Sequence, residues 1–241
     1  MSVDHDVSQH TRDWYQESYE EGGLAAQRRY PNEELLRFFG RRLFPIPAAQ
    51  REGIHVLELG SGSCANLWMV AREGFAAYGI DLAPEAAELG NKMLDSWGAS
   101  ADLRTGSMDD LPWPDESFHV VFDVFSANCL DSAAFSKCLE EVSRVLKPGG
   151  HFFTHTPSKR SDDFLHPGPA SMIDPNTLDG IRRADAVFAG NHYPFRFSHP
   201  RELESQLQEV GLTVGYMETL GRTYHDRRDY FEFVIAEASK V

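Results

Sequence analysis

The chain has 241 residues, of which 41% are hydrophobic and 25% charged, and its formal net charge is −14. Such a chain can fold as one α/β domain with additions or as two small domains, and its negative charge argues against nucleic acid or an anionic membrane as a partner. No apolar run approaches the length of a membrane span. Three cysteines without paired spacing, and an N-terminus without an apolar leader, favour a reduced cytoplasmic protein.

Residues 1–50 are expected to form a helical cap. Residues 1–12 are polar and acidic, and we expect them to be disordered or frayed. Helical patterns follow over residues 12–21 and 32–44, and in the second one hydrophobic residues recur at helical spacing before prolines end it. These helices would pack on the rest of the chain or close over a ligand site.

Short apolar runs alternate with helical patterns from residue 51 to residue 156. We expect strands near residues 54–59, 76–80, 101–105, 118–124 and 151–155. Helices are expected near residues 65–73, 84–97 and 133–146. This β-α-β rhythm predicts a Rossmann-like, doubly wound parallel sheet, whose ligands bind beyond the carboxyl ends of the strands.

The alternation stops at Pro157. Residues 157–198 are rich in Pro, Gly, Asp, Asn and Arg, and we expect only short helices there, around residues 175–187. A connection of this length is typical of a lid or binding loop. The pattern resumes with one helix and two strands, near residues 199–210, 212–219 and 229–237. Residues 51–241 would then form one domain that carries the lid.

The first predicted strand ends at an acid and a glycine turn. Glu58 precedes Gly60-Ser61-Gly62, and Asp81 stands at the end of the second strand. Glycine lets the backbone turn tightly and lets a ligand approach, and a carboxylate in the position of Asp81 can accept hydrogen bonds from ribose hydroxyls. These features predict a nucleotide-binding corner, which fits a methyl donor or a nicotinamide dinucleotide.

Four motifs in this order resemble those of the class I S-adenosylmethionine-dependent methyltransferases of the small-molecule type. The motifs are Val56-Leu57-Glu58-Leu59-Gly60-Ser61-Gly62, Gly79-Ile80-Asp81-Leu82, the run 106–113 leading into Phe118-His119-Val120-Val121-Phe122, and the run 141–150. The resemblance implies a mostly parallel, seven-stranded sheet with an antiparallel last strand. It also implies S-adenosyl-L-methionine as the cofactor, S-adenosyl-L-homocysteine as its product, and no metal.

The resemblance further implies which residues hold the cofactor. They are Glu58, Gly60, Ser61, Gly62 and Asn66 toward the methionine part, Asp81 and Leu82 at the ribose and adenine, Ser107, Met108 and Asp109 at the adenine edge, and Phe125 beside the sulfonium. Arg29 or Tyr30 would lie near the carboxylate of the cofactor. The chain departs from the family pattern at Cys64, where a third glycine is usual, at Ser107, where an acid is common, and at His119, where Asp is usual.

Methyl transfer is an in-line displacement that requires alignment of the reactants and exclusion of water, and an acceptor that carries a proton also needs a base. The candidates for catalysis are His155, His192 and Tyr193, each of which could instead have a structural role. The candidates for substrate contact are Tyr15, Tyr30, Arg160 and Arg196. Basic residues gather in the lid and would suit an anionic acceptor, although a solvated loop explains them equally well.

The sequence therefore predicts S-adenosylmethionine-dependent methyl transfer to a small molecule, most readily to an oxygen of a sugar, natural product or small acid. An NAD(P)-dependent oxidoreductase and a protein methyltransferase are the alternatives. Glu58 and the two later motifs argue against the oxidoreductase. A subunit that binds the cofactor without turnover is a further possibility, and the acceptor, the base and the oligomeric state stay open.

Overall fold

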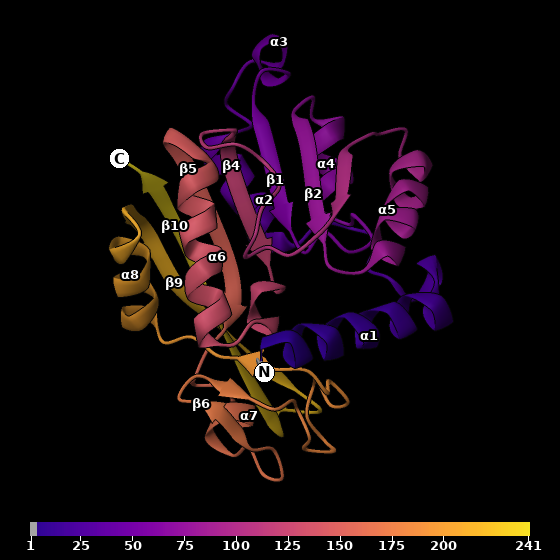
Figure 1. Cartoon of the computed structure of the whole chain (residues 1–241), viewed down its shortest axis with the longest axis vertical. Coiled ribbons are helices and arrows are strands. Elements are labelled where there is room, and N and C mark those ends of the chain that lie inside the picture. Colours follow the sequence, from indigo (N-terminus) through magenta and orange to yellow (C-terminus); the bar gives the residue numbers. More distant parts are fainter. Residues whose placement is uncertain (1–3) are drawn as a thin grey trace.

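The computed structural model describes residues 4–241, and a seven-stranded sheet forms its centre (Figure 1). The strands are β1 (His55–Leu59), β2 (Ala76–Asp81), β3 (Asp102–Thr105), β4 (Phe118–Val124), β5 (Leu146–Pro157), β9 (Leu212–Tyr224) and β10 (Asp229–Lys240). Their order is β3-β2-β1-β4-β5-β10-β9, with β1 to β5 parallel and β10 antiparallel to both of its neighbours. The predicted mostly parallel, seven-stranded sheet is confirmed.

Helices cover both faces of the sheet. They are α2 (Glu33–Arg42), α4 (Leu67–Arg72), α5 (Pro84–Ser96), α6 (Ser132–Val145) and α8 (Pro200–Glu209), with the shorter α3 (Ala48–Arg51) and η2 (Ala127–Cys129) between elements. Successive strand residues point to opposite faces, so Val120 and Phe122 pack with α2 and α4, whereas Val121 packs with α6 and α8. The strand sequences are almost continuously apolar because helices bury both faces of the sheet.

The N-terminal segment differs from its prediction. Within the expected disordered region, the chain is helical from Asp4 onward, and α1 runs unbroken over Asp4–Gly22 before η1 (Leu24–Ala26); residues 1–3 lie outside the described part. Tyr19 is buried against Ala83 and Ala86 at the start of α5. This tertiary contact stabilises a helix whose polar sequence gave little local signal.

The lid also differs from its prediction. In place of short helices around residues 175–187, it forms a three-stranded sheet from β6 (Met172–Asp174), β7 (Thr177–Leu178) and β8 (Phe195–Arg196), after the short α7 (Asp162–Leu165). These strands are too short to show a period of two, and the pairing of β7 with β8 joins segments almost twenty residues apart. Figure 1 shows the lid and α1 beyond the same end of the main sheet, where β1 and β2 finish.

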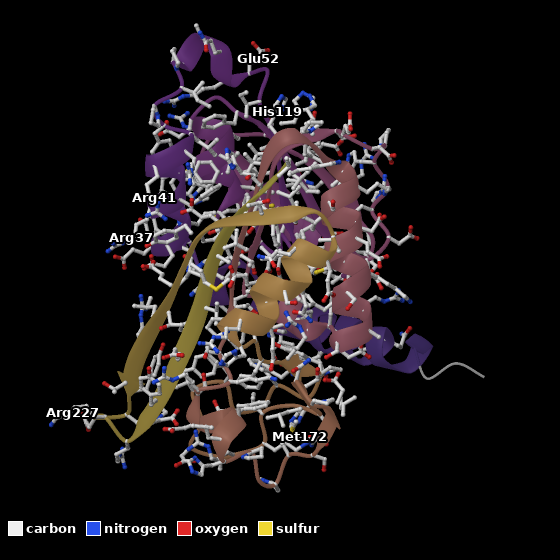
Figure 2. All side chains as sticks on the ribbon, turned by 90° about the vertical axis from the view of Figure 1, so that its left-hand side faces the viewer. Arg37, Arg41, Glu52, His119, Met172 and Arg227 are labelled. Carbon is white, nitrogen blue, oxygen red and sulfur yellow. The ribbon has the colours of Figure 1, made fainter. Side chains whose placement is uncertain are left out.

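The last two strands extend past the main sheet to the lid. β9 ends five residues later than the strand expected near 212–219, and this extension carries the β9–β10 turn toward the lid, whereas the three residues by which β10 exceeds the strand expected near 229–237 lie at its opposite end. Figure 2 shows their turn, marked by Arg227, at the level of the lid, marked by Met172. Phe231 and Phe233 of β10 consequently join the aromatic residues of the lid in one cluster.

Candidate functional site

Two cavities adjoin each other at the carboxyl ends of the parallel strands, and both are lined by Val124 and Phe125. The inner chamber has a volume of about 160 Å³ and is lined by Gly60, Asp81, Leu82, Ser107 and Met108, with Tyr15 and Tyr19 of α1 over it. The outer chamber has a volume of about 430 Å³ and is lined by Arg28, Asn32, His155, Phe188, Arg222 and Phe233, together with Gln27, Glu33 and Glu34. A ligand that fills the inner chamber would therefore meet a second ligand beside Phe125.

The glycine turn has a backbone that other residues rarely adopt. Gly60 and Gly62 have φ angles of 63° and 48°, in the left-handed region. A Cβ on Gly60 would lie 2.4 Å from Cβ of Ser126, so the turn approaches the end of β4 too closely for any side chain. Cys64 also has a positive φ of 61°, and its buried thiol lies against Gly90 of α5, which has no side chain to oppose it.

Asp81 presents its carboxylate to the inner chamber. One oxygen accepts a hydrogen bond from the backbone N–H of Gly62 at 2.8 Å, and the other accepts one from Ala83 at 3.0 Å. Burial raises the pKa of Asp81, and the backbone hydrogen bonds oppose that rise. The carboxylate is thereby fixed in orientation while it still borders the cavity.

Glu58 lies beneath the turn with one oxygen free. Asn66 donates to Glu58 Oε1 at 2.6 Å and accepts from Arg28 at 2.8 Å. Glu58 Oε2 is buried and has no hydrogen-bond partner among the described residues. Burial raises the pKa of Glu58 to about 8, while Asn66 and Arg28 act in the opposite direction. Glu58 lines neither chamber, and its unpaired acceptor lies beneath the glycine turn.

Arg28 was not predicted as a site residue from the sequence, whereas its neighbours Arg29 and Tyr30 were. The backbone carbonyl of Arg29 accepts from Trp68, and the Tyr30 side chain packs on Trp97 with the residue 63% exposed. Tyr30 therefore lines neither chamber. Three adjacent positions of an irregular segment point in different directions, and nothing in the local pattern distinguishes them.

The other expected cofactor residues fall into two groups. Leu82, Ser107 and Met108 line the inner chamber. Asp109 accepts a short hydrogen bond from the Ser107 hydroxyl instead of lining the cavity, and Ser61 is buried, with its N–H bonded to the Ile80 carbonyl.

Phe125 separates the two chambers. Its φ angle of 59° is unusual for a residue with a side chain, and its backbone N–H donates to the His155 carbonyl. The ring packs against Phe188 of the lid and Phe233 of β10. Residues far apart in the chain thus hold Phe125 in a strained conformation at the junction, as is common at functional sites.

The three candidates for catalysis have different surroundings. His155 is 6% exposed and lines the outer chamber, and burial together with Arg222 and Arg28 lowers its pKa to about 4. Tyr193 is buried behind Tyr15, with the two hydroxyl oxygens 3.1 Å apart, and burial raises the pKa of both. His192 is exposed and lines neither chamber.

The basic residues of the lid lie away from both chambers. The Arg160 side chain is 71% exposed, 3.8 Å from Glu232. Arg196 is buried with its guanidinium carbon 3.3 Å from the centre of the Phe135 ring. The other lid cations form ion pairs, as in Lys159–Glu202, Arg182–Asp179 and Arg183–Asp163. The arginines that do line the outer chamber, Arg28 and Arg222, lie outside the lid.

Within residues 4–241, no cluster of three or more His, Cys, Asp or Glu is arranged to hold a metal ion. In the same part of the chain, no helix has the length and apolar character required to cross a membrane.

Comparisons with known proteins agree with this geometry. Residues 56–150 match a family described as a methyltransferase domain. A sterol 4-C-methyltransferase of Caenorhabditis elegans is 30% identical over 113 residues, which are 46% of this chain and 33% of that protein. A ubiquinone biosynthesis O-methyltransferase of Paramagnetospirillum magneticum is 27% identical over 167 residues, covering 69% of this chain and 62% of that protein. The chain thus spans between a third and two thirds of these relatives.

A solved structure extends the likeness over the whole fold. The 1,6-didemethyltoxoflavin-N1-methyltransferase of Burkholderia thailandensis, which holds 1,6-didemethyltoxoflavin and S-adenosylhomocysteine, has a TM-score of 0.62 and 16% identity, covering 100% of this chain and 92% of that one. The family match decides against the oxidoreductase alternative that the glycine turn had left open. Residues 56–150 of this chain match a methyltransferase domain, and the whole chain has the fold of the class I methyltransferases.

Proposed function

We propose that the protein transfers a methyl group from S-adenosylmethionine to an oxygen of a small-molecule acceptor. The observation that carries the proposal is the pair of chambers that adjoin at Val124 and Phe125. The inner one borders the glycine turn and Asp81, which suit a nucleoside, and the outer one is large enough for a small organic molecule.

Residues in and beside the two chambers fit the cofactor. The Asp81 carboxylate in the inner chamber can accept hydrogen bonds from ribose hydroxyls, and the unpaired Oε2 of Glu58, beneath the glycine turn, can accept one from the α-ammonium group. Arg28, which lines the outer chamber, can pair with the α-carboxylate. When bound, S-adenosylmethionine supplies an electrophilic methyl group on a positively charged sulfur.

The chain itself contributes alignment and exclusion of water. In this proposal, residues 1–50 cap the cofactor through Tyr15 and Tyr19, while the lid and β10 enclose the acceptor with Phe188 and Phe233. Alignment of the acceptor with the methyl group can supply a large part of the rate enhancement of such a displacement. The names of the relatives refer to a sterol, ubiquinone biosynthesis and a toxoflavin precursor, which supports a small-molecule acceptor over a protein.

The proposal is tested in two steps. Isothermal titration calorimetry should detect saturable binding of S-adenosylhomocysteine and none of NAD⁺ or NADP⁺. Release of S-adenosylhomocysteine from S-adenosylmethionine is then measured over a panel of phenols, carboxylic acids and sugars, with unfolded proteins and peptides as the competing class. Binding of a nicotinamide dinucleotide, or turnover with peptides alone, would overturn the proposal.

A further inference from the structure

The outer chamber is lined by both apolar and polar side chains. The apolar ones are Val124, Phe125, Phe188 and Phe233, and the polar ones include Arg28, Asn32, His155 and Arg222, with Glu33 and Glu34. The rings suit a flat, apolar body. The polar residues therefore determine which functional group of an acceptor can be held there.

The hydrogen bonds of Asn32 determine which nitrogen of His155 carries the proton. Asn32 Oδ1 accepts from the backbone N–H groups of Glu34 and Leu35, as the N-cap of α2. Its Nδ2, which can only donate, therefore faces His155 Nδ1 at 3.3 Å. In the neutral ring Nδ1 must then accept, and the proton lies on Nε2.

His155, which lines the chamber, consequently has a hydrogen-bond donor at Nε2. Its Nε2 is buried and has no partner among the described residues. Burial and the positive charges of Arg222 and Arg28 lower the pKa of the imidazole to about 4, so the ring is neutral near pH 7. A neutral ring whose lone pair is already bonded to Asn32 is poorly suited to remove a proton from an acceptor.

The other titratable groups near the chamber are also unsuited to act as a base. The Tyr15 hydroxyl is protonated, because burial raises its pKa well above its usual value. Glu33 and Glu34 each face the Arg37 guanidinium, at 3.1 and 3.6 Å. Among the described residues that line the chamber, the two carboxylates are therefore weak bases held by a guanidinium.

We propose that the acceptor is a small aromatic carboxylic acid, which enters the outer chamber already ionised and is methylated on its carboxylate. This inference rests on the proposed function. One carboxylate oxygen accepts the hydrogen bond from His155 Nε2–H. Arg222, whose nearest carboxylate oxygen, on Glu33, is 3.9 Å away, attracts the negative charge.

The step requires no proton transfer. A carboxylate oxygen forms a bond to the methyl carbon as the bond from carbon to sulfur breaks, and the electron pair of that bond remains on sulfur. The negative charge of the acid and the positive charge of the sulfonium both disappear, giving a methyl ester and S-adenosylhomocysteine. Because the ester lacks the charge that Arg222 attracts, it should bind more weakly than the acid, which favours product release.

Binding of matched acids and amides tests the charge requirement. Benzoate, cinnamate and 2-naphthoate are compared with their neutral amides by calorimetry on the protein saturated with S-adenosylhomocysteine. We expect at least one acid to bind tenfold or more tightly than its amide. R222Q should lower the affinity for that acid at least fivefold. R227Q, which removes the same charge from the turn of the same hairpin, should leave the affinity unchanged. The proposal fails if no acid exceeds its amide.

Nitrogen-15 NMR of the histidine side chains tests the tautomer directly. We expect the His155 ring to carry its proton on Nε2 and to remain neutral down to about pH 5. In N32D the carboxylate still caps α2 but accepts from Nδ1–H, so the proton should move to Nδ1. A wild-type ring protonated on Nδ1, with its lone pair toward the chamber, would identify a base and contradict the proposal.

Two substitutions of His155 distinguish a hydrogen-bond donor from a general base. H155Q keeps an N–H donor near the position of Nε2, whereas H155L removes it. With an acid as acceptor, we expect H155Q to keep kcat within about fivefold and H155L to raise KM about tenfold. Equal loss of kcat in both variants, with S-adenosylhomocysteine binding intact, would overturn this inference and leave the proposed function standing. Loss of cofactor binding by the wild type would instead overturn the proposed function.

Discussion

The two chambers are built in different ways. The inner one is held mainly by the backbone of neighbouring elements, since Gly60 and Gly62 have positive φ angles and Asp81 is bonded to the N–H groups of Gly62 and Ala83. The outer one depends on side chains from five distant segments, among them Asn32, Phe125, His155, Phe188 and Arg222. The glycine turn and Asp81 of the first can therefore be recognised in a short stretch of sequence, while the second exists only after the whole chain has folded.

The lid is fixed to β10 by buried polar contacts. Arg183 bridges Asp163 and Asp229, whose side chains are 2% and 3% exposed. Glu232 accepts from the Ser158 hydroxyl, and its own N–H donates to Ser161. Polar contacts of this kind are directional, so they fix residues 157–198 against β10, whose Phe233 lines the outer chamber.

The largest expected effect comes from the glycine turn. In Gly60→Ala, the new Cβ would meet Ser126 in a backbone conformation that alanine rarely adopts. We expect a loss of about 2–4 kcal/mol in the free energy of unfolding and no measurable binding of S-adenosylhomocysteine. Chemical denaturation and calorimetry measure the two effects.

Gly40→Ala is the matched control, because Gly40 lies within α2 and a Cβ there meets nothing within 4 Å. It should gain a few tenths to about 1 kcal/mol from helix propensity. Equal stability of Gly60→Ala and Gly40→Ala would show that the turn tolerates a side chain. It would contradict the view that the backbone of this turn shapes the inner chamber.

Arg183→Leu should loosen the lid alone. It leaves Asp163 and Asp229 buried without their shared partner, at a cost of about 3 kcal/mol. Hydrogen exchange should accelerate over residues 157–198, while affinity for S-adenosylhomocysteine changes less than twofold. Arg182→Leu, which removes a more exposed pair with Asp179, should alter neither quantity. A large loss of cofactor affinity in Arg183→Leu would mean that the chambers are coupled.

Asp81→Ala should weaken the cofactor without affecting the lid. Loss of charge-assisted hydrogen bonds is expected to cost on the order of 1–3 kcal/mol, or tenfold or more in the dissociation constant of S-adenosylhomocysteine. Asp81→Asn keeps the shape of the side chain and should lose less. Unchanged affinity in the alanine variant, measured by calorimetry, would mean that the ribose is held elsewhere.

Glu58 should make cofactor binding depend on pH. Burial raises the pKa of Glu58 to about 8, so near neutrality the free protein mostly holds a proton that a bound ammonium would displace. We expect the affinity for S-adenosylhomocysteine to rise several-fold between about pH 6.5 and 8, with proton release detected by calorimetry in two buffers. Glu58→Gln should abolish both effects, and an unchanged pH dependence would argue against this contact.

The raised pKa of Glu58 also makes the free energy of unfolding depend on pH. The folded protein holds a proton on Glu58 that the unfolded chain releases near its ordinary pKa of about 4.5. The free energy of unfolding should therefore fall as the pH rises from that value through about 8. Glu58→Gln should remove this decline in thermal unfolding of the free protein.

The sequence by itself indicated a doubly wound parallel sheet, the glycine turn and the position of Asp81, because these features depend on short-range periodicity and on backbone conformation. The cofactor roles of these residues stay predictions, and the structure gathers most of them around the inner chamber.

Only the tertiary structure decided the rest. It selected Arg28 over Arg29 and Tyr30, and Arg222 over Arg160 and Arg196. It also replaced the expected lid helices with strands and extended α1 through the region expected to be disordered. Each of these outcomes depends on contacts between residues far apart in the chain. In irregular segments, adjacent side chains point in different directions, so no local pattern could have predicted these outcomes.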